Sequence, residues 1–294
     1  MGRGRATLVG FGAVLLWAGL ALLTVRTAPV PPLALNALTF GIATGVGVAW
    51  GLATGTLGEL GRVPWGVYAL GTLGLFGYHL LYFSAFRLGP PAETGLIAYL
   101  WPLLIVLGSG LLPGERLRAG HVLGAAVAFA GAGLIVLGRG GAAGEAANAP
   151  LGFALAFLAA LTWAAYSILS RRMGRWPTST VTVFCAGTAV LSLGAHLLWE
   201  TPAWPDGAEG WMAVLALELG PVGLAFFLWD VGVKRGDIQL LGTASYAAPI
   251  LSTGALVLAG ETEGSWRLGL AALLVAGGAA LAARPGVSRR AAET

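Results

Sequence analysis

The chain has 294 residues, of which 57% are hydrophobic and 10% are charged, and its formal net charge is +4. Soluble domains carry about 25% charged residues, so this composition excludes an ordinary soluble protein and points to a chain solvated mainly by lipid. In a soluble protein the basic charge would suggest nucleic acid binding. Here the basic residues lie in short segments between apolar runs, so no nucleic acid partner is predicted.

Ten apolar runs are long enough to cross a hydrocarbon core of ~30 Å, which takes about 20 helical residues. In chain order they cover residues 7–25, 33–52, 65–86, 94–112, 121–138, 151–170, 178–199, 210–231, 239–260 and 267–283. Arg3 and Arg5 precede the first run, but no small-residue cleavage site follows, so it is not a secretory signal. The predicted fold class is an all-α polytopic membrane protein with ten transmembrane helices.

The basic residues indicate an orientation, because cytoplasmic loops are enriched in Lys and Arg. With the N-terminus inside, only four basic residues lie outside, namely Arg26, Arg87, Arg139 and Arg267. The other thirteen then lie inside: Arg3, Arg5, Arg62, Arg116, Arg118, Arg171, Arg172, Arg175, Lys234, Arg235, Arg284, Arg289 and Arg290. We therefore expect a multi-pass protein of the bacterial inner membrane with both termini in the cytoplasm.

Four pairs of segments recur in register at an offset of about 146 residues, which indicates an internal repeat. The pairs are Trp17 and Trp163, Gly74-x-x-Gly77 and Gly220-x-x-Gly223, Tyr99-x-x-Pro102 and Tyr246-x-x-Pro249, and Gly114-Glu115 and Gly260-Glu261. This predicts a first five-helix repeat at residues 1–139, a polar linker at 140–150 and a second repeat at 151–294. Because five is odd, the second repeat enters the membrane with the opposite sense to the first.

Inverted repeats place a substrate site near the middle of the bilayer, where helices are interrupted at corresponding positions. Pro102 and Pro249 fall within the fourth and ninth runs and are such positions. We therefore expect the gating or hinge residues to be the paired glycines and prolines of the repeat: Gly74, Gly77, Pro102, Gly220, Gly223 and Pro249.

The repeated segments resemble carriers of the drug/metabolite transporter superfamily, in particular the EamA-type proteins, over nearly the whole chain. The matching pieces surround Trp17 and Trp163, and include Tyr99-Leu-Trp-Pro102 and Ser245-Tyr-Ala-Ala-Pro249 with their Gly-Glu partners. Within that family, the segment Gly77-Tyr-His-Leu-Leu-Tyr-Phe-Ser-Ala-Phe86 and Trp101 look like the YddG-type aromatic amino acid exporters. The resemblance implies export of aromatic and other neutral amino acids from the cytoplasm.

Ionisable groups inside membrane spans are costly, so each is a functional candidate. His79 shares a helical face with nearby tyrosines and is interpreted as a cavity residue, the alternative being a structural bond to a neighbouring helix. Glu218 either meets a substrate ammonium group in the cavity or is bonded to a neighbouring span. His196 is expected to lie at the membrane interface. With no Lys or Arg deep in any run, polyanions are not expected as substrates.

Aromatic residues are the other candidates, although Trp and Tyr also concentrate at membrane interfaces. Three tryptophans lie near the middle of runs, and with four tyrosines they could form a pocket in which rings stack and an ammonium group gains cation–π attraction. The predicted substrate-binding set is therefore Trp17, Tyr78, His79, Tyr82, Tyr99, Trp101, Trp163, Glu218 and Tyr246.

The leading function is alternating-access transport of small organic molecules, with other metabolites or drugs as the alternative cargo. An intramembrane enzyme would need a nucleophile with its base, paired carboxylates or metal ligands, and no such motif is present. The single Cys185 offers no metal cluster, and no Walker loop or cofactor motif is found, so no cofactor is expected. A passive channel or receptor stays open, and a monomer is the default.

Overall fold

The structure is a computed structural model and describes residues 2–110, 117, 119–137, 148–173, 176–177, 179–236, 241 and 245–283. Within these ranges every regular element is helical. The helices are α1 (Arg3–Ala18), α2 (Leu20–Arg26), α3 (Pro32–Thr54), η1 (Leu57–Arg62), α4 (Trp65–Leu88), α5 (Pro91–Ala98), α6 (Trp101–Ser109), α7 (Ala119–Leu137), α8 (Ala149–Arg172), α9 (Thr180–Trp199), α10 (Ala208–Leu219), η3 (Gly220–Leu224), α11 (Ala225–Arg235), α13 (Ala248–Leu258) and α14 (Trp266–Ala283). Gly114-Glu115 and linker residues 140–147 lie outside the described residues.

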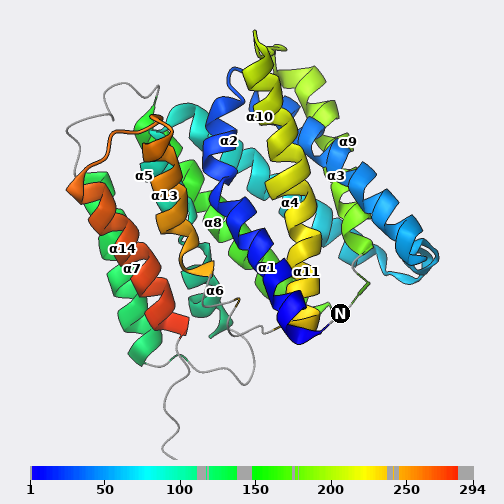
Figure 1. Ribbon diagram of the computed structural model, residues 1–294, viewed down its shortest axis with the longest axis horizontal. Helices are drawn as coiled ribbons and strands as arrows, with labels where there is room; N and C mark the ends of the chain where they lie inside the picture. The colour runs from blue at the N-terminus through cyan, green and yellow to red at the C-terminus, as the bar shows by residue number, and fades with distance from the viewer. Residues whose placement is uncertain are drawn as a thin grey trace, which may run out of the picture.

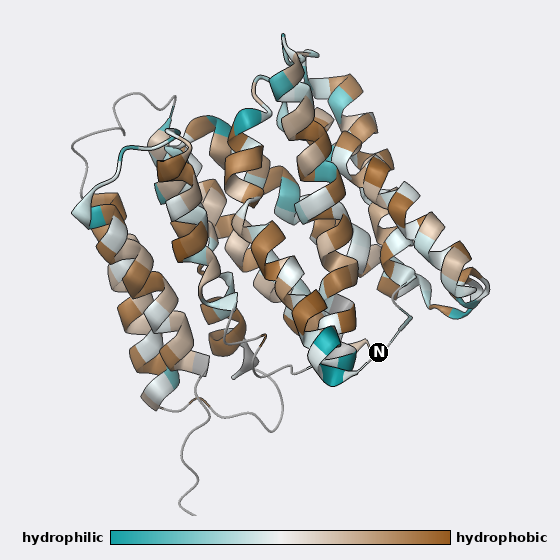
Figure 2. Cartoon of the chain, in the orientation of Figure 1, coloured by the Kyte–Doolittle hydropathy of each residue, from teal (hydrophilic) through white to brown (hydrophobic). Residues whose placement is uncertain are grey.

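Eight helical segments are long and apolar enough to cross a membrane, and two shorter apolar helices follow at Ala248–Leu258 and Trp266–Ala282. The most hydrophilic residues lie mainly near the ends of the helices, whereas hydrophobic residues cover most of their length (Figure 2). Helices suit this role because each satisfies its own backbone hydrogen bonds, which lipid cannot do.

Three of these segments are interrupted, and two of the interruptions contain a proline. Gly19 alone separates α1 from α2. The chain breaks at Tyr99 and Leu100 because Pro102, the second residue of α6, has no N–H to continue α5. The third interruption is the π-helical turn η3, which carries Pro221 and joins α10 to α11. The ends of six α-helices are therefore brought into the interior of the bundle: α1 and α2, α5 and α6, and α10 and α11.

The most extensive helix contacts join segments before residue 140 to segments after residue 148. They pair α7 with α14, α4 with α8, α3 with α9, and α1 with α11. In Figure 1, α7 and α14 lie side by side along one edge of the molecule. Their approach is close because glycines face the partner backbone, and a Cβ at Gly124 would stand 2.5 Å from the Gly278 carbonyl oxygen.

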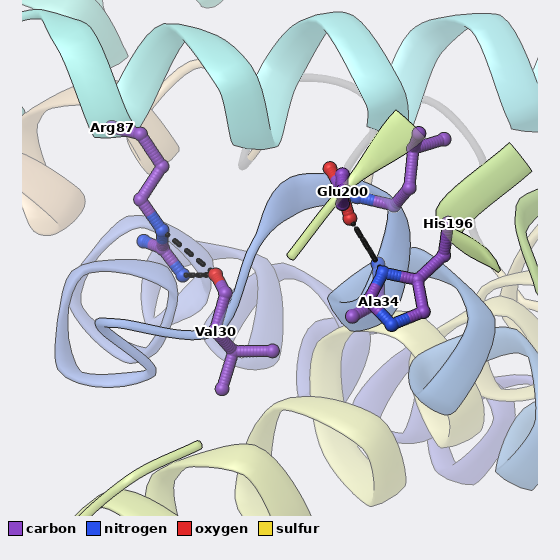
Figure 3. A network of polar contacts seen from close by, with 6 residues as sticks. Val30, Ala34, Arg87, His196 and Glu200 are labelled. Atoms are coloured by element: carbon purple, nitrogen blue, oxygen red, sulfur yellow. Dashed lines mark hydrogen bonds and ion pairs between the residues drawn. The ribbon is translucent and has the colours of Figure 1, made fainter. Parts of the chain in front are cut away.

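Polar side chains fasten the end of the bundle opposite the N-terminus, which we call the distal end and which contains connections 27–31, 89–90, 200–207 and 259–265. The Arg87 guanidinium donates to the carbonyl oxygens of Val30 (2.9 Å) and Thr24 (2.9 Å) and to the Thr27 hydroxyl (2.8 Å). Figure 3 shows the guanidinium directed at the Val30 carbonyl. Arg87 thereby ties the end of α4 to the connection between α2 and α3.

A second anchor of the distal end is Glu200, which follows α9. Its carboxylate accepts the backbone N–H groups of Leu33 (2.8 Å) and Ala34 (3.0 Å), where the positive end of the α3 dipole favours an anion. The Nδ1 atom of His196 lies 2.9 Å from a carboxylate oxygen of Glu200 (Figure 3). The His196 side chain is 5% exposed and packs inside the bundle with Glu200, so it does not face outward; its place at the membrane interface stays a prediction.

We predict that Arg87→Ala lowers the free energy of unfolding by about 2–4 kcal/mol, since hydrogen bonds from a charged donor are lost and the Val30 carbonyl loses its Arg87 partner. Thermal unfolding of the purified protein in detergent measures this. Arg62→Ala, an exposed arginine on η1, is the matched control and should change little. Equal unfolding temperatures for the two variants would contradict the anchoring role of Arg87.

Candidate functional site

A pocket of about 360 Å³ lies inside the bundle, within the roughly 300–1,000 Å³ typical of small-molecule sites. The three interrupted segments, together with α4, α8 and the start of α13, supply its walls. The lining residues are Val14, Trp17, Leu20, Tyr78, His79, Tyr82, Ala98, Tyr99, Trp101, Ile105, Trp163, Ser167, Pro221, Phe226, Trp229, Ser245 and Ala248.

Trp17 is the point at which the three interrupted segments meet. Its indole N–H donates to the carbonyl oxygen of Pro221 in the π-helical turn at 3.1 Å. Its own backbone carbonyl, next to the break at Gly19, accepts the hydroxyl of Tyr99 at 3.1 Å. Tyr99 in turn lies at the break between α5 and α6. One residue of α1 is therefore bonded to irregular backbone regions of two other spans.

Aromatic rings form a continuous wall of the pocket. Trp17 contacts the rings of Trp229 (5.3 Å between centroids) and Phe226 (6.1 Å). Phe226 also contacts Trp163 at 6.4 Å, and Trp163 contacts Tyr78 at 4.9 Å. All four contacts are tilted or edge-on, the arrangements that aromatic pairs prefer. The wall thus presents both ring faces and ring edges to a guest.

The polar side-chain groups that line the pocket are hydroxyls, indole N–H groups and one imidazole, and several of them are already engaged. The hydroxyls of Ser167 and Ser245 donate to carbonyls of their own segments. The Nδ1 atom of His79 lies 3.0 Å from the Leu75 carbonyl oxygen. A carbonyl can only accept, so Nδ1 carries the proton and a neutral imidazole keeps Nε2 as an acceptor. Among the described lining residues none is Asp, Glu, Lys or Arg.

The structure brings seven of the nine predicted binding residues to this pocket: Trp17, Tyr78, His79, Tyr82, Tyr99, Trp101 and Trp163. Glu218 and Tyr246 are not among its described lining residues. Glu218 lies on α10 and is 1% exposed, and its Oε1 atom has no hydrogen-bond partner among the described residues. A role of any of these nine side chains in substrate binding stays a prediction.

The predicted hinge residues fall into two groups. Pro102, Pro249, Gly220 and Gly223 lie at helix starts or in the π-helical turn, so the backbone is irregular there. By contrast, α4 runs unbroken through Gly74 and Gly77, and a Cβ at Gly74 would stand 2.6 Å from the Tyr166 ring. Gly74 therefore lets α4 and α8 pack closely. A gating role stays a prediction for all six residues.

Sequence reasoning missed two large lining residues, Phe226 and Trp229. They lie three residues apart, one helical turn after Pro221, and therefore share a face of α11. That spacing next to a proline-interrupted segment was the available signal. Ser167 was also missed, although it lies four residues after Trp163 on the same face of α8.

An ion-pair cluster closes the distal end beyond the pocket. Gly260, with φ +75°, ends α13 in a left-handed turn, and the Glu261 N–H bonds back to the Leu256 carbonyl at 3.0 Å. This turn places the Glu261 carboxylate 2.9 Å from Nε of Arg26, whose Nη1 lies 3.4 Å from Glu209. Arg26 therefore links α2 to the end of α13 and the start of α10.

Exposure of the lining residues differs between the two ends of the pocket. Leu20, Tyr82 and Ala98, toward the distal end, are each less than 9% exposed. Ser167 and Trp229, toward the end that carries the N-terminus, are partly exposed. The lining residues named at the distal end are therefore buried in this structure.

Comparisons with known proteins agree with this architecture. The chain matches the EamA-like transporter family twice, over residues 4–137 and 150–284. It is 53% identical to the "Aromatic amino acid exporter YddG" of Ancylobacter novellus, covering 96% of this chain and 98% of that protein. It is 26% identical to the protein of the same name from Escherichia coli, covering 96% and 97%.

A solved crystal structure is 52% identical in sequence and superposes with a TM-score of 0.74, covering 96% of this chain and 98% of the other. Both matches to the family together extend over most of the chain, and the described helices include eight that can cross a membrane. The chain therefore belongs to the EamA-like transporter family.

Proposed function

We propose that this protein exports aromatic and other neutral amino acids across the bacterial inner membrane. The observation that carries the proposal is the pocket wall, which offers aromatic rings, a neutral imidazole acceptor and no charged side chain among its described lining residues. Such a wall favours a guest with a flat apolar group and no net charge. The names of these relatives, aromatic amino acid exporters, support the same substrate class.

The topology we propose has ten spans and places both termini in the cytoplasm. It combines the eight long helices with α13 and α14, and it leaves only four of the 17 basic residues outside. The two inverted repeats, 1–139 and 151–294 around the linker, receive support from the paired helix contacts. At the repeat offset, α1 corresponds to α8, and α4 corresponds to the span that contains α11. The α1–α11 pair and the α4–α8 pair are therefore equivalent, and both are among the most extensive contacts.

Transport then proceeds by alternating access, in which the two halves rock about the pocket as a monomer. With the N-terminus inside, the distal end faces outward, so this structure corresponds to the state closed to the outside. Arg26 and Glu261 hold that closure because they link the two repeats across the distal end. Opening the pocket outward requires this pair to separate.

The first test is efflux of labelled amino acids from proteoliposomes. We expect saturable efflux of phenylalanine and tryptophan, with slower efflux of glutamate and lysine, whose net charge finds no counter-charge in the pocket. Failure of every amino acid to move would refute the proposed substrate class and would direct attention to other neutral aromatic metabolites or drugs.

In the same assay, Trp163→Ala should raise the KM for phenylalanine about tenfold, because one ring of the wall and its aromatic contacts are lost. Trp199→Ala is the matched control, since Trp199 is 77% exposed at the end of α9 and lies outside the pocket. An unchanged KM for Trp163→Ala, or an equal rise for both variants, would contradict the pocket assignment.

The distal closure is tested by thiol labelling of Leu20→Cys in a Cys185→Ala background, with an impermeant reagent added from outside. Arg26→Gln should increase labelling several-fold, because Glu261 and Glu209 lose their partner. Asp206→Asn, which removes an exposed charge at the same end, should not. Exchange of the pair, Arg26→Glu with Glu261→Arg, should restore protection; persistent labelling in the exchanged pair would argue against an ion-pair closure.

A further inference from the structure

We infer that the π-helical turn η3 is a positioning element for the substrate site, acting through the indole of Trp17. The inference rests on the proposed function and adds a role for Pro221, whose carbonyl sets the orientation of one aromatic ring in the pocket. Pro221 also lines the pocket itself, so its two contributions must be separated by experiment. The positioning effect passes through Trp17.

The turn is built by two residues. Pro221 has no N–H, so the Leu217 carbonyl loses its usual partner four residues later, which disfavours regular α-helix here. Gly223 allows the wider turn, since a Cβ at this position would collide with the Glu218 carbonyl oxygen. A π-helical turn inside a helix often marks a functional site because its cost in helix stability must be offset elsewhere.

The turn presents a backbone carbonyl that accepts a hydrogen bond from a side chain of another helix. The Pro221 carbonyl oxygen takes the Trp17 indole N–H at 3.1 Å, across 204 residues of sequence. The ring so held faces Trp229 and Phe226, both on α11 immediately after the turn. Fixing the indole nitrogen fixes the plane of the ring, and a fixed plane is what a stacked guest requires.

The corresponding place in the first half is built differently. At the repeat offset of 146, Pro221 corresponds to Leu75 and Trp17 corresponds to Trp163. The Leu75 carbonyl is engaged by His79 of its own helix, and α4 stays regular. Trp163 is placed by ring contacts with Tyr78, Trp101 and Tyr166. Both tryptophans have ring contacts, and Trp17 has in addition a hydrogen bond to the backbone of the π-helical turn.

This difference supplies a matched control for a double-mutant cycle. Trp17→Phe removes the indole N–H and keeps a ring, and Pro221→Ala restores an N–H that lets the helix straighten. Each should raise the KM for phenylalanine about three- to tenfold, with Vmax changing less, as the loss of one hydrogen bond predicts. If one bond carries both effects, the double variant should be no worse than the more affected single variant.

The control cycle combines Trp163→Phe with Pro221→Ala. Its effects on KM should come much closer to multiplying, because the described contacts give Trp163 no hydrogen bond to the turn and only a ring contact with Phe226 beyond it. Multiplying effects in the Trp17 cycle, or non-additivity in both cycles, would overturn the inference. If Pro221→Ala does not fold, Gly223→Ala perturbs the same turn and takes its place.

Binding of phenylalanine to the detergent-solubilised protein, measured by calorimetry, separates this inference from the proposed function. If the wild-type protein neither binds nor transports aromatic amino acids, the proposed function fails. If it does both and the Trp17 cycle is additive, the function stands and only the positioning role fails.

Discussion

The constraint on which this structure depends is that lipid offers no hydrogen bonds to a peptide backbone. Every break in a spanning helix therefore needs a partner supplied by the protein. The breaks at Gly19, at Tyr99 and in η3 meet this need largely through one another, because Tyr99 bonds the Trp17 carbonyl and Trp17 bonds the Pro221 carbonyl. The three irregular backbone segments therefore lie close together, and residues from all three line the pocket.

Charged side chains, by contrast, are not among the described residues that line the pocket. Among the described residues, ion pairs join Arg26 to Glu261 and Glu209, and the Glu200 carboxylate contacts the His196 ring, all at the distal end. Near the headgroups an ion pair avoids most of the desolvation penalty that it would meet at the bilayer centre. The described ion pairs and the aromatic pocket wall thus lie in different parts of the structure.

Much of this arrangement could be predicted from the sequence, since apolar runs of spanning length locate the helices and proline locates a break wherever an N–H is missing. Pro102 and Pro249 illustrate this, as each stands at the second position of a helix. The break at Gly19 has no such local cause, because glycine permits a break without requiring one. It depends on the neighbouring Tyr99, which only the folded chain supplies.

The pocket residues show the same limit. Mid-span tryptophans are rare enough to be noticed, whereas Trp229 near the end of a run has the same local sequence context as an interfacial residue. Glu218 was singled out because a carboxylate inside a span is costly, but cost alone does not say which way a side chain points. It lies on α10, one turn before the pocket begins, and is buried among other helices.

The absence of charge among the described lining residues has an energetic consequence for the direction of transport. A transmembrane voltage acts only on charge that moves, at roughly 2.3 kcal/mol per elementary charge per 100 mV. A zwitterionic amino acid in a neutral pocket carries none, and the reorienting site adds none of its own. If the proposed function holds and no ion moves with the substrate, the membrane voltage does no work on this cargo, and the concentration ratio of the amino acid sets the direction of flow.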